Sequence, residues 1–284
     1  MMKQIDNIHA FIGMDHPYEE AKIVLVGVPF DGTTSYRPGT RFAPSQIRID
    51  SYGLETYSPY LDKDLKEIAL SDIGDISIPF GNTMKALENI KETMDVLLKD
   101  DKKPLVIGGE HLISLPVVEA LCKKYSELSI LHFDAHTDLR DHYLGEKISH
   151  ATVMRRVHEL VGDGHIFQFG IRSGTKEEFI WAKNHTYLHP FDLDTLEQII
   201  KILMNKPIYL SIDLDVLDPS VFSGTGTPEP GGITMKELLE AFILMQKLSF
   251  VGADVVELSP HYDPSGVSTA VACKVIREVA LLLN

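Results

Sequence analysis

Short apolar runs alternate with amphipathic stretches along almost the whole chain. Runs rich in Ile, Val and Leu predict strands at residues 22–28, 67–72, 104–107, 128–133, 165–169, 186–188, 207–212 and 250–256. Apolar residues that recur every three or four positions predict helices at residues 83–98, 114–124, 152–161, 176–183, 196–204, 235–248 and 268–283. Thr234 precedes Glu237 by three positions, which is typical of the first turn of a helix.

The predicted strands are apolar on both faces, which is typical of a parallel sheet that helices cover on both sides. The alternation of strands and helices therefore predicts an α/β fold, a three-layer α/β/α sandwich around a mostly parallel sheet of about eight strands. In 284 residues we find no internal repeat, low-complexity linker or block of like charge that would mark a domain boundary. We expect residues 1–284 to form a single domain.

The chain is acidic, with a formal net charge of −14. Because nucleic acids require clustered Lys and Arg, this charge argues against a nucleic-acid partner and weakly favours a small cationic substrate. No run of about 18 apolar residues occurs, and residues 1–6 contain no apolar stretch typical of a signal peptide. Cys122 and Cys273 are the only cysteines, too few for a disulfide framework. We therefore expect a soluble cytoplasmic protein without a membrane span.

Residues of the types that bind metal ions follow three of the predicted strands, at residues 104–107, 128–133 and 207–212. The candidates are His111, Asp134, His136, Asp138, Asp213 and Asp215. The second and third groups occupy alternate positions, whose side chains share one face of an extended backbone. The carboxyl ends of parallel strands meet at one edge of a sheet, where α/β proteins build their sites. The pattern therefore predicts one metal centre that holds two ions.

Each candidate on its own has an ordinary structural explanation, since Asp134 or Asp213 could cap a turn and His136 could be a hydrogen-bonded core residue. Six such residues at three strand ends favour a metal centre instead. Four carboxylates and two imidazoles, without a thiolate, disfavour a structural zinc site. Two divalent ions would neutralise the carboxylates, and bridging carboxylates hold such ions about 3.5–4 Å apart. This ligand set fits Mn²⁺ best, with Co²⁺, Fe²⁺ or Zn²⁺ as alternatives.

Three motifs resemble those of the ureohydrolases, the family of arginase, agmatinase and their relatives. The motifs are Gly109-Glu110-His111, Asp134-Ala135-His136-Thr137-Asp138 and Ser211-Ile212-Asp213-Leu214-Asp215-Val216-Leu217-Asp218-Pro219. The resemblance extends from Gly27-Val28-Pro29 to the C-terminal helix. It implies two Mn²⁺ ions, one bound by His111, Asp134, Asp138 and Asp213, the other by His136, Asp134, Asp213 and Asp215.

The resemblance also implies a reaction. A hydroxide that bridges the two ions would attack the guanidinium carbon of a substrate. Asp138 would hydrogen-bond that hydroxide and help to pass a proton to the leaving amine. Glu257 matches the glutamate that binds the guanidinium, and His150 matches the histidine that shuttles protons. The alternative for Glu257 is an ordinary glutamate at a strand end, and the alternative for His150 is a histidine of a surface loop. Ala151 stands where many relatives have Gly or Ser. His132 matches no ligand position, and we expect it to belong to the core.

Two features bear on the substrate. Arginases carry an Asn two residues after the last Asp of the second motif, where this chain has Arg140. The Gly- and Pro-rich loops at residues 32–44 and 224–232 are more similar to those of agmatinases than to those of arginases. The resemblance therefore implies the hydrolysis of agmatine to putrescine and urea, a step of polyamine and putrescine biosynthesis. It also implies a homo-oligomer, either a trimer or a hexamer.

Other substrates stay open at this point. Guanidinobutyrate, guanidinopropionate, arginine and formiminoglutamate carry a carboxylate, with which Arg37, Arg41 or Arg140 could pair. A metal-dependent deacylase is a further alternative, because deacetylases have a similar scaffold, but their site keeps one zinc ion and fewer Asp ligands. A non-catalytic homologue would be expected to lack one or more of the six ligands, and this chain keeps all of them.

Overall fold

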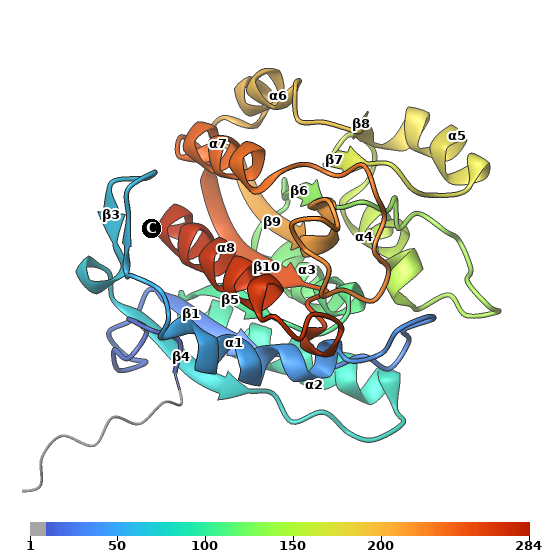
Figure 1. Cartoon of the computed structure of the whole chain (residues 1–284). Coiled ribbons are helices and arrows are strands. Elements are labelled where there is room, and N and C mark those ends of the chain that lie inside the picture. Colours follow the sequence, from blue (N-terminus) through green and yellow to red (C-terminus); the bar gives the residue numbers. More distant parts are fainter. Residues whose placement is uncertain (1–9) are drawn as a thin grey trace, which may run out of the picture.

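The computed structural model describes residues 10–284, and its centre is a sheet of eight strands (Figure 1). The strand order is β4-β1-β5-β10-β9-β6-β7-β8, and each neighbouring pair runs parallel. The strands are β1 (Ile23–Gly27), β4 (Leu70–Asp75), β5 (Lys103–Ile107), β6 (Ser129–Phe133), β7 (Ile166–Ile171), β8 (Tyr187–Pro190), β9 (Pro207–Asp213) and β10 (Ser249–Val256). The predicted sheet is confirmed. Residues 1–6, in which we expect no signal peptide, lie outside the described residues.

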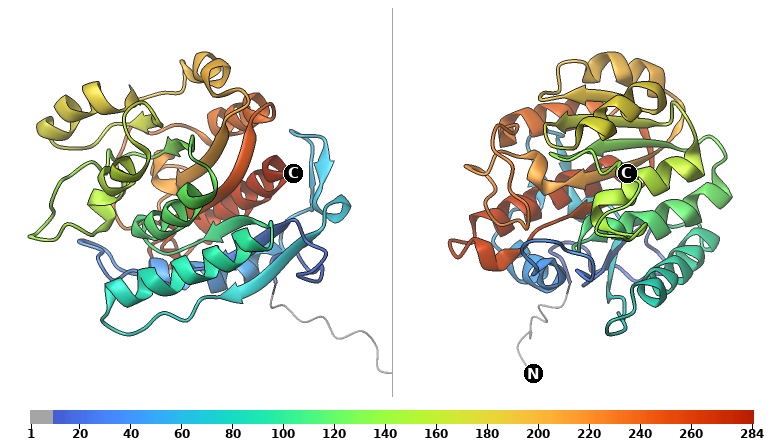
Figure 2. Two further views of the ribbon diagram at one scale, coloured as in Figure 1. Left: turned by 180° about the vertical axis from the view of Figure 1, so that it is seen from behind. Right: turned by 90° about the vertical axis from the view of Figure 1, so that its right-hand side faces the viewer.

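Helices cover both faces of the sheet (Figure 2). One apolar core lies between the sheet and α1 (Ala43–Ser51), α6 (Leu196–Leu203), α7 (Met235–Met245) and α8 (Val267–Leu283). A second lies between the opposite face and α2 (Thr83–Lys99), α3 (Ser114–Lys124), α4 (Val153–Val161) and α5 (Lys176–His185). Buried apolar side chains of the strands contribute to both cores, as a sheet covered on both sides requires. The three-layer α/β/α fold is thereby confirmed.

The path of the chain brings four strands together in the middle of the sheet. β1, β4 and β5 form one half and β6, β7 and β8 form the other, and then β9 and β10 fill the space between the halves. The strand order reverses there, and ligands of α/β proteins bind beside the carboxyl ends of strands at such a point. The central strands β5, β10, β9 and β6 are therefore the ones that position the site.

The elements agree with the prediction to within a few residues, with two additions. β4 begins at Leu70, later than predicted, because Leu65–Glu67 form a short 3₁₀ turn. The hairpin of β2 (Tyr57–Ser58) and β3 (Lys63–Asp64) and the helix α1 were not predicted. α1 offers little apolar periodicity, because Arg48 on its buried side forms ion pairs with Asp72 and Asp75 instead of packing as an apolar residue.

The helix starts follow local capping signals. At the start of α7 the Thr234 hydroxyl accepts a hydrogen bond from the Glu237 N–H (3.2 Å), and the Glu237 carboxylate accepts one from the Thr234 N–H (2.7 Å). This reciprocal pair confirms the predicted start of the helix. Across residues 10–284, no helix combines the length and the apolar character needed to cross a membrane.

Gly109 sits where three backbone segments approach closely beside the carboxyl end of β5. Its φ is +78°, and a Cβ atom there would lie 2.5 Å from the carbonyl oxygen of Val28 and 2.9 Å from that of Phe30. Its own carbonyl accepts a hydrogen bond from the N–H of Glu257 (3.0 Å), the residue that follows β10. Only glycine fits this position without displacing the turn that leads to His111.

Replacing Gly109 with Ala tests this close approach. Gly266→Ala is the matched control, because Gly266 also has a positive φ (+77°) but has open space where a Cβ would lie. We expect the control to lower the free energy of unfolding by about 1 kcal/mol. Gly109→Ala should lower it by about 1–3 kcal/mol more, since the new methyl group overlaps backbone atoms. Urea unfolding measures both values, and equal losses would contradict the steric argument.

Candidate metal centre and substrate pocket

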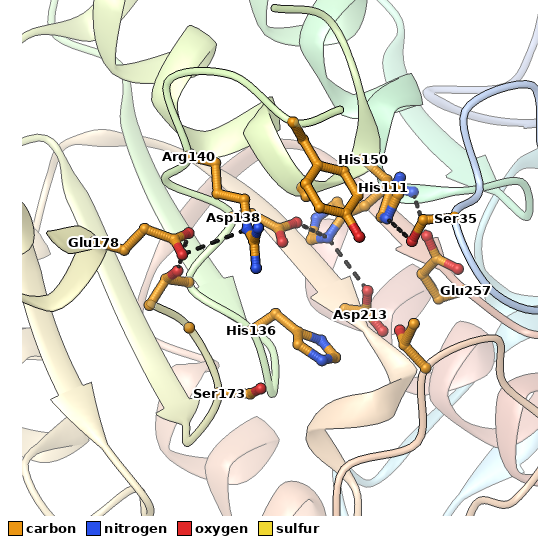
Figure 3. Close-up of a pocket in the computed structure, with 15 residues that line it drawn as sticks. Ser35, His111, His136, Asp138, Arg140, His150, Ser173, Glu178, Asp213 and Glu257 are labelled. Carbon is orange, nitrogen blue, oxygen red and sulfur yellow. Dashed lines mark hydrogen bonds and ion pairs between the residues drawn. The ribbon is translucent and has the colours of Figure 1, made fainter. Parts of the chain in front are cut away.

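The six predicted metal-binding residues lie at the carboxyl ends of central strands. Figure 3 labels His111, His136, Asp138 and Asp213 among them. His111 begins the 3₁₀ turn His111–Ile113 after β5, and Asp213 is the last residue of β9, followed by Asp215 in the turn Leu214–Val216. The remaining three come from the loop after β6. The structure therefore brings all six to one place, as the strand-end argument predicts, and buries all of them except His136, which is partly exposed.

The loop after β6 reaches this place in a different way than predicted. β6 ends at Phe133, before Asp134, and Asp138 has a left-handed backbone with φ +53°. The alternate spacing of Asp134, His136 and Asp138 therefore does not reflect an extended backbone, and the prediction that they share one face of such a backbone was wrong. A turn brings these side chains together instead, in which Oδ1 of Asp134 accepts a hydrogen bond from the N–H of His136 (2.6 Å).

Each of three carboxylates has one oxygen anchored by the backbone. The anchors are Asp134 Oδ1 with the His136 N–H, Asp213 Oδ1 with the Asp215 N–H (2.9 Å), and Asp215 Oδ1 with the Ala135 N–H (3.1 Å). The other oxygen, Oδ2, lies near a ring nitrogen in every case. The backbone thus holds the carboxylates so that one oxygen of each faces the centre.

The atoms that face the centre lie close together without hydrogen bonds between them. Nδ1 of His111 is 3.0 Å from Oδ2 of Asp134 and 3.3 Å from Oδ2 of both Asp138 and Asp213, yet it is buried without a hydrogen-bond partner. Oδ2 of Asp215 is likewise buried and unpartnered, 3.0 Å from Nδ1 of His136. Ligands about 2.0–2.2 Å from a metal ion lie about 3 Å apart when they are neighbours around it. These spacings and unpartnered atoms fit metal ligation.

A hydrogen-bond chain inside the sheet fixes which nitrogen of His111 carries hydrogen. Its Nε2 lies 2.9 Å from the Ser211 hydroxyl, which donates its only hydrogen to Asp254 (2.8 Å). Ser211 must therefore accept from Nε2–H, which leaves the Nδ1 lone pair directed at the carboxylates. Tyr209 donates to the second oxygen of Asp254 (2.5 Å). This arrangement is typical of a metal-binding histidine whose other nitrogen is held by the protein.

Asp134 receives a second anchor from a histidine. His132 Nε2 lies 2.9 Å from Oδ2 of Asp134, and the Gln168 amide donates to Nδ1 of His132 (3.1 Å). Because Nδ1 accepts, Nε2 carries the hydrogen and donates it to the carboxylate. We predicted His132 to be a core residue; it is buried in the sheet, and there it orients Asp134.

The buried charges shift the pKa values of the cluster. Burial and the neighbouring carboxylates raise the pKa of Asp213 and that of Glu257 well above the usual range of a carboxyl group. Burial alone would lower the pKa of His111 and that of His136, but the surrounding carboxylates raise both well above that of a free histidine. These four groups therefore bind protons readily, and divalent cations would compete with protons at the three that are candidate ligands, His111, His136 and Asp213.

A cavity of about 260 Å³ opens directly onto the cluster. Its lining includes Ser35, His111, His136, Asp138, Arg140, Tyr143, His150, Ser173, Glu178, Asp213 and Glu257. Figure 3 shows His150 and Glu257 on one side of His111, with Arg140 and Glu178 on the other. The two residues predicted to act on the substrate therefore share a cavity with the candidate metal ligands.

Glu257 and His150 are both held in place at the cavity wall. The buried Glu257 carboxylate accepts a hydrogen bond from the N–H of His111 (2.7 Å). The backbone N–H of His150 donates to the Thr33 hydroxyl (3.0 Å), and its Nε2 lies 3.2 Å from the Ser35 hydroxyl. Burial lowers the pKa of His150 despite the nearby Asp138 charge, so this imidazole is neutral at neutral pH and can accept a proton.

Comparisons with known proteins agree with this geometry. The family model described as the arginase family matches residues 21–282. The chain belongs to the arginase family. It is 50% identical over 271 residues to an agmatinase of Bacillus cereus (94% of this chain, 93% of that one) and 50% identical over 275 residues to an agmatinase of Bacillus subtilis (95% of each). The crystal structure of a Clostridium difficile protein superposes with a TM-score of 0.92 at 52% identity, covering 94% of this chain and 98% of that one.

Membership of the arginase family confirms the resemblance inferred from the three motifs. Enzymes of this family hydrolyse guanidino compounds and depend on a pair of metal ions, so this chain is a hydrolase of that kind. The clusters that could hold an ion include Asp134, His136 and Asp215.

The cations considered as partners for a substrate carboxylate are all engaged by the protein. Arg140 Nε lies 3.6 Å from Glu178, and its guanidinium carbon lies 4.5 Å from the centre of the Tyr143 ring. Arg41 forms an ion pair with Asp31, and the Arg37 guanidinium lies over the ring of Tyr262. Of the three, only Arg140 lines the cavity of this arginase-family site.

Several supporting residues were missed from the sequence. Arg172 donates to the backbone carbonyls of Asp215 (2.7 Å), Val216 (3.1 Å) and Glu229 (2.7 Å), and so anchors the turn that carries Asp215. The buried carboxylate of Glu178 accepts from the Thr137 hydroxyl (2.6 Å) and from the N–H of Leu139 (3.1 Å), which holds the loop after β6. The sequence signal for Glu178 was its position three residues after Thr175, the spacing of a capping box. Asp254 could have been recognised as a supporting residue because it is a carboxylate within an apolar strand.

Replacing Ser211 with Ala tests the chain that holds His111. The change leaves the His111 Nε2–H and one oxygen of Asp254 without partners inside the sheet. We expect the free energy of unfolding to fall by about 1–3 kcal/mol. Mn²⁺ binding should weaken about 10- to 100-fold, because the imidazole is no longer held in one orientation. Urea unfolding and equilibrium dialysis measure these quantities.

Ser129→Ala is the matched control for that variant. Ser129 is a buried serine of the neighbouring strand β6, and its hydroxyl has no hydrogen-bond partner. We expect this variant to bind Mn²⁺ like the unmodified protein. Unchanged Mn²⁺ affinity in Ser211→Ala would contradict the role of the chain.

Proposed function

We propose that this arginase-family protein hydrolyses agmatine to putrescine and urea, as one step of polyamine and putrescine biosynthesis. The observation that carries the proposal is the group of unpartnered nitrogen and oxygen atoms around His111 and Asp215, which opens into a cavity bordered by Glu257 and His150. The Bacillus agmatinases that are 50% identical over nearly the whole chain support agmatine as the substrate.

The proposed ligands divide into two overlapping sets. One set is His111, Asp134, Asp138 and Asp213. Oδ2 of each of the three aspartates lies 3.0–3.3 Å from Nδ1 of His111. The other is His136, Asp134, Asp213 and Asp215, supported by the contacts of His136 Nδ1 with Asp134 (3.5 Å) and Asp215 (3.0 Å). Asp134 and Asp213 would be shared. Mn²⁺ suits four carboxylates and two imidazoles, and Co²⁺, Fe²⁺ and Zn²⁺ are the alternatives.

The side chains of the cavity supply the remaining steps. Two divalent ions, when bound, make water a strong nucleophile near neutral pH. Glu257 pairs with the planar guanidinium through charge-assisted hydrogen bonds and presents its carbon to the metal centre. Asp138 accepts a hydrogen bond from the attacking water and holds its proton. His150, a neutral imidazole within the cavity, takes up the proton that the water has lost and delivers it to the amine nitrogen as the C–N bond breaks, which releases putrescine and urea.

The state of Arg140 favours a substrate without a carboxylate tail. Its pairing with Glu178 and its stacking on Tyr143 offset its charge within the cavity. A carboxylate tail would have to compete with Glu178 for this guanidinium. Agmatine has an amine at that end, so it does not compete with Glu178 for the Arg140 guanidinium. This contact therefore separates agmatine from guanidinobutyrate, guanidinopropionate, arginine and formiminoglutamate.

Three further expectations belong to the same proposal. We expect the described residues to fold as one domain, because both apolar cores extend along the single central sheet. We expect a cytoplasmic enzyme, because Cys122 and Cys273 are both free thiols. We also expect a homo-oligomer, a trimer or a hexamer, as the resemblance to the ureohydrolases implies.

A substrate panel tests the proposed function. Mn²⁺-loaded protein is assayed for urea release from agmatine, arginine, guanidinobutyrate and guanidinopropionate, and for formamide release from formiminoglutamate. We expect kcat/KM for agmatine to exceed that for each of the others by at least about 100-fold, because the buried polar groups of a site discriminate strongly against a mismatched tail. A carboxylate-bearing substrate at the top of the panel would overturn the assignment of agmatine.

The variant Arg140→Gln, assayed with the same substrates, tests whether Arg140 binds a substrate carboxylate. If Arg140 serves Glu178 and not the substrate, kcat/KM for agmatine should change by less than about tenfold. A substrate whose carboxylate pairs with Arg140 would lose about 1.5–3 kcal/mol, or about 10- to 100-fold, because that charged hydrogen bond is removed. Such a loss for a substrate that leads the panel would show that Arg140 binds the tail.

Replacing His150 with Asn tests the proton-transfer role. We expect kcat to fall by about 10²- to 10⁴-fold, because Asn cannot relay a proton to the leaving amine. The Mn²⁺ content should stay unchanged, because His150 belongs to neither ligand set. His261→Asn is the control, since the His261 ring packs at a tilt against the ring of Phe42 and His261 is not among the cavity residues. Stopped assays and metal analysis give both readouts, and a nearly unchanged kcat would remove His150 from the mechanism.

A further inference from the structure

Three side chains outside the cavity converge where α4 and α5 end. His158 lies in the last turns of α4, His185 is the last residue of α5, and Asp163 lies in the connection that follows α4. Nε2 of His158 is 2.7 Å and Nδ1 of His185 is 2.6 Å from the same oxygen of Asp163. One donor atom of each residue lies within 4.8 Å of the other two. We refer to these three residues as the His158–His185 cluster.

The backbone builds this cluster through two glycines. Gly162 N–H donates to the carbonyl of His158 (2.8 Å), and Gly164 N–H donates to the carbonyl of His185 (3.2 Å). Both glycines have a positive φ, +81° and +77°. They flank Asp163 directly, so the same turn is tied to both histidines and holds the carboxylate between the ends of the two helices.

The single tryptophan of the chain holds the two imidazole rings. Trp181 stacks on His185 with ring centroids 4.2 Å apart and meets His158 edge-on at 4.7 Å. The guanidinium of Arg155 lies 3.9 Å from the Trp181 ring centre. Within residues 10–284, Asp163 forms ion pairs with the two histidines and with no Lys or Arg. Its carboxylate is therefore available to a cation.

From this geometry we infer that the His158–His185 cluster is a second metal site, for a single ion of the Zn²⁺, Ni²⁺ or Cu²⁺ class. Two imidazoles and one carboxylate form a nitrogen-rich donor set that such ions prefer. A divalent ion replaces the two protons that now lie between the ring nitrogens and the shared oxygen. The Asp163 side chain is 65% exposed, so water can complete the coordination and the ion can enter from solvent.

The cluster differs from the metal centre in chemistry and in place. The centre is rich in carboxylates and suits Mn²⁺, whereas two of the three ligands here are imidazoles. The two sites are connected through α4 and α5. His150 lies just before the start of α4, and Glu178, which holds the loop after β6, lies in the first turn of α5. An ion in the cluster therefore fastens the carboxyl-terminal ends of α4 and α5, whose amino-terminal ends lie next to His150 and at Glu178.

Trp181 gives a direct readout of the inferred site. Mn²⁺-saturated protein is titrated with Ni²⁺ while tryptophan fluorescence is followed. We expect quenching that saturates at one Ni²⁺ per chain, because the ion would bind next to the only tryptophan. Zn²⁺, which does not quench, should displace Ni²⁺ and restore the fluorescence, whereas further Mn²⁺ should not. Zn²⁺ should also raise the Tm of the Mn²⁺-saturated protein.

Three variants separate this site from other causes of quenching. Asp163→Asn keeps both rings against Trp181 and should weaken Ni²⁺ binding at least tenfold. His142→Gln is the matched control, because His142 contacts Asp141 (2.9 Å) without a second imidazole, and its titration should match that of the unmodified protein. Asp213→Asn alters the metal centre and should leave the quenching intact.

The outcomes decide the inference. Saturable quenching that weakens in Asp163→Asn and persists in Asp213→Asn supports a second metal site. Quenching that is unchanged in Asp163→Asn, or lost in Asp213→Asn, overturns it, because the ion would then act from another position. The absence of saturable quenching up to millimolar Ni²⁺ also overturns it and leaves the cluster as an ion pair between helix ends.

Discussion

Four carboxylates and two imidazoles are packed together at the edge of an apolar sheet, and the need to offset their charge shapes the surrounding structure. Such groups are costly to bury unless they are paired and hydrogen-bonded. One oxygen each of Asp134, Asp213 and Asp215 is satisfied by a backbone N–H, and the other is turned toward a shared centre. His111 is held from behind through Ser211, so its lone pair faces the same point. The protein thus holds these four residues from behind and leaves the atoms that face the centre for two cations.

The topology of the sheet makes this concentration of charge feasible. β9 and β10 enter last and separate two halves that were laid down earlier in the chain, so the strand ends with ligands become neighbours. Glu257 ties this arrangement together, because its carboxylate binds the N–H of His111 and its own N–H binds the carbonyl of Gly109. The group proposed to bind the substrate and a proposed metal ligand therefore share one rigid turn. With the proposed roles, the orientation of the guanidinium relative to the ions would depend on these backbone hydrogen bonds.

The layers of the fold and the six candidate ligands could be predicted from local patterns, because buried parallel strands are apolar on both faces and each ligand lies at the end of one of them or in the loop that follows. The supporting contacts could not. Ser211 pairs with Asp254 across β9 and β10, and His132 pairs with Gln168 across β6 and β7, so both depend on the register between strands. α1 was missed because an ion-paired Arg48 occupies its buried side. The loop at Asp134 was taken for an extended backbone because a turn stabilised by its own side chain can give the same alternate spacing.

Arg172 adds a different kind of stability to this site. Its guanidinium is surrounded by backbone carbonyls, among them those of Asp215, Val216 and Glu229, and it lies beneath the turn that carries the acidic groups. An arginine stays charged at any physiological pH. It therefore supplies a positive charge that neither a chelator nor a change of metal supply can remove. The shape of the acidic turn can accordingly survive the exchange of one metal ion for another.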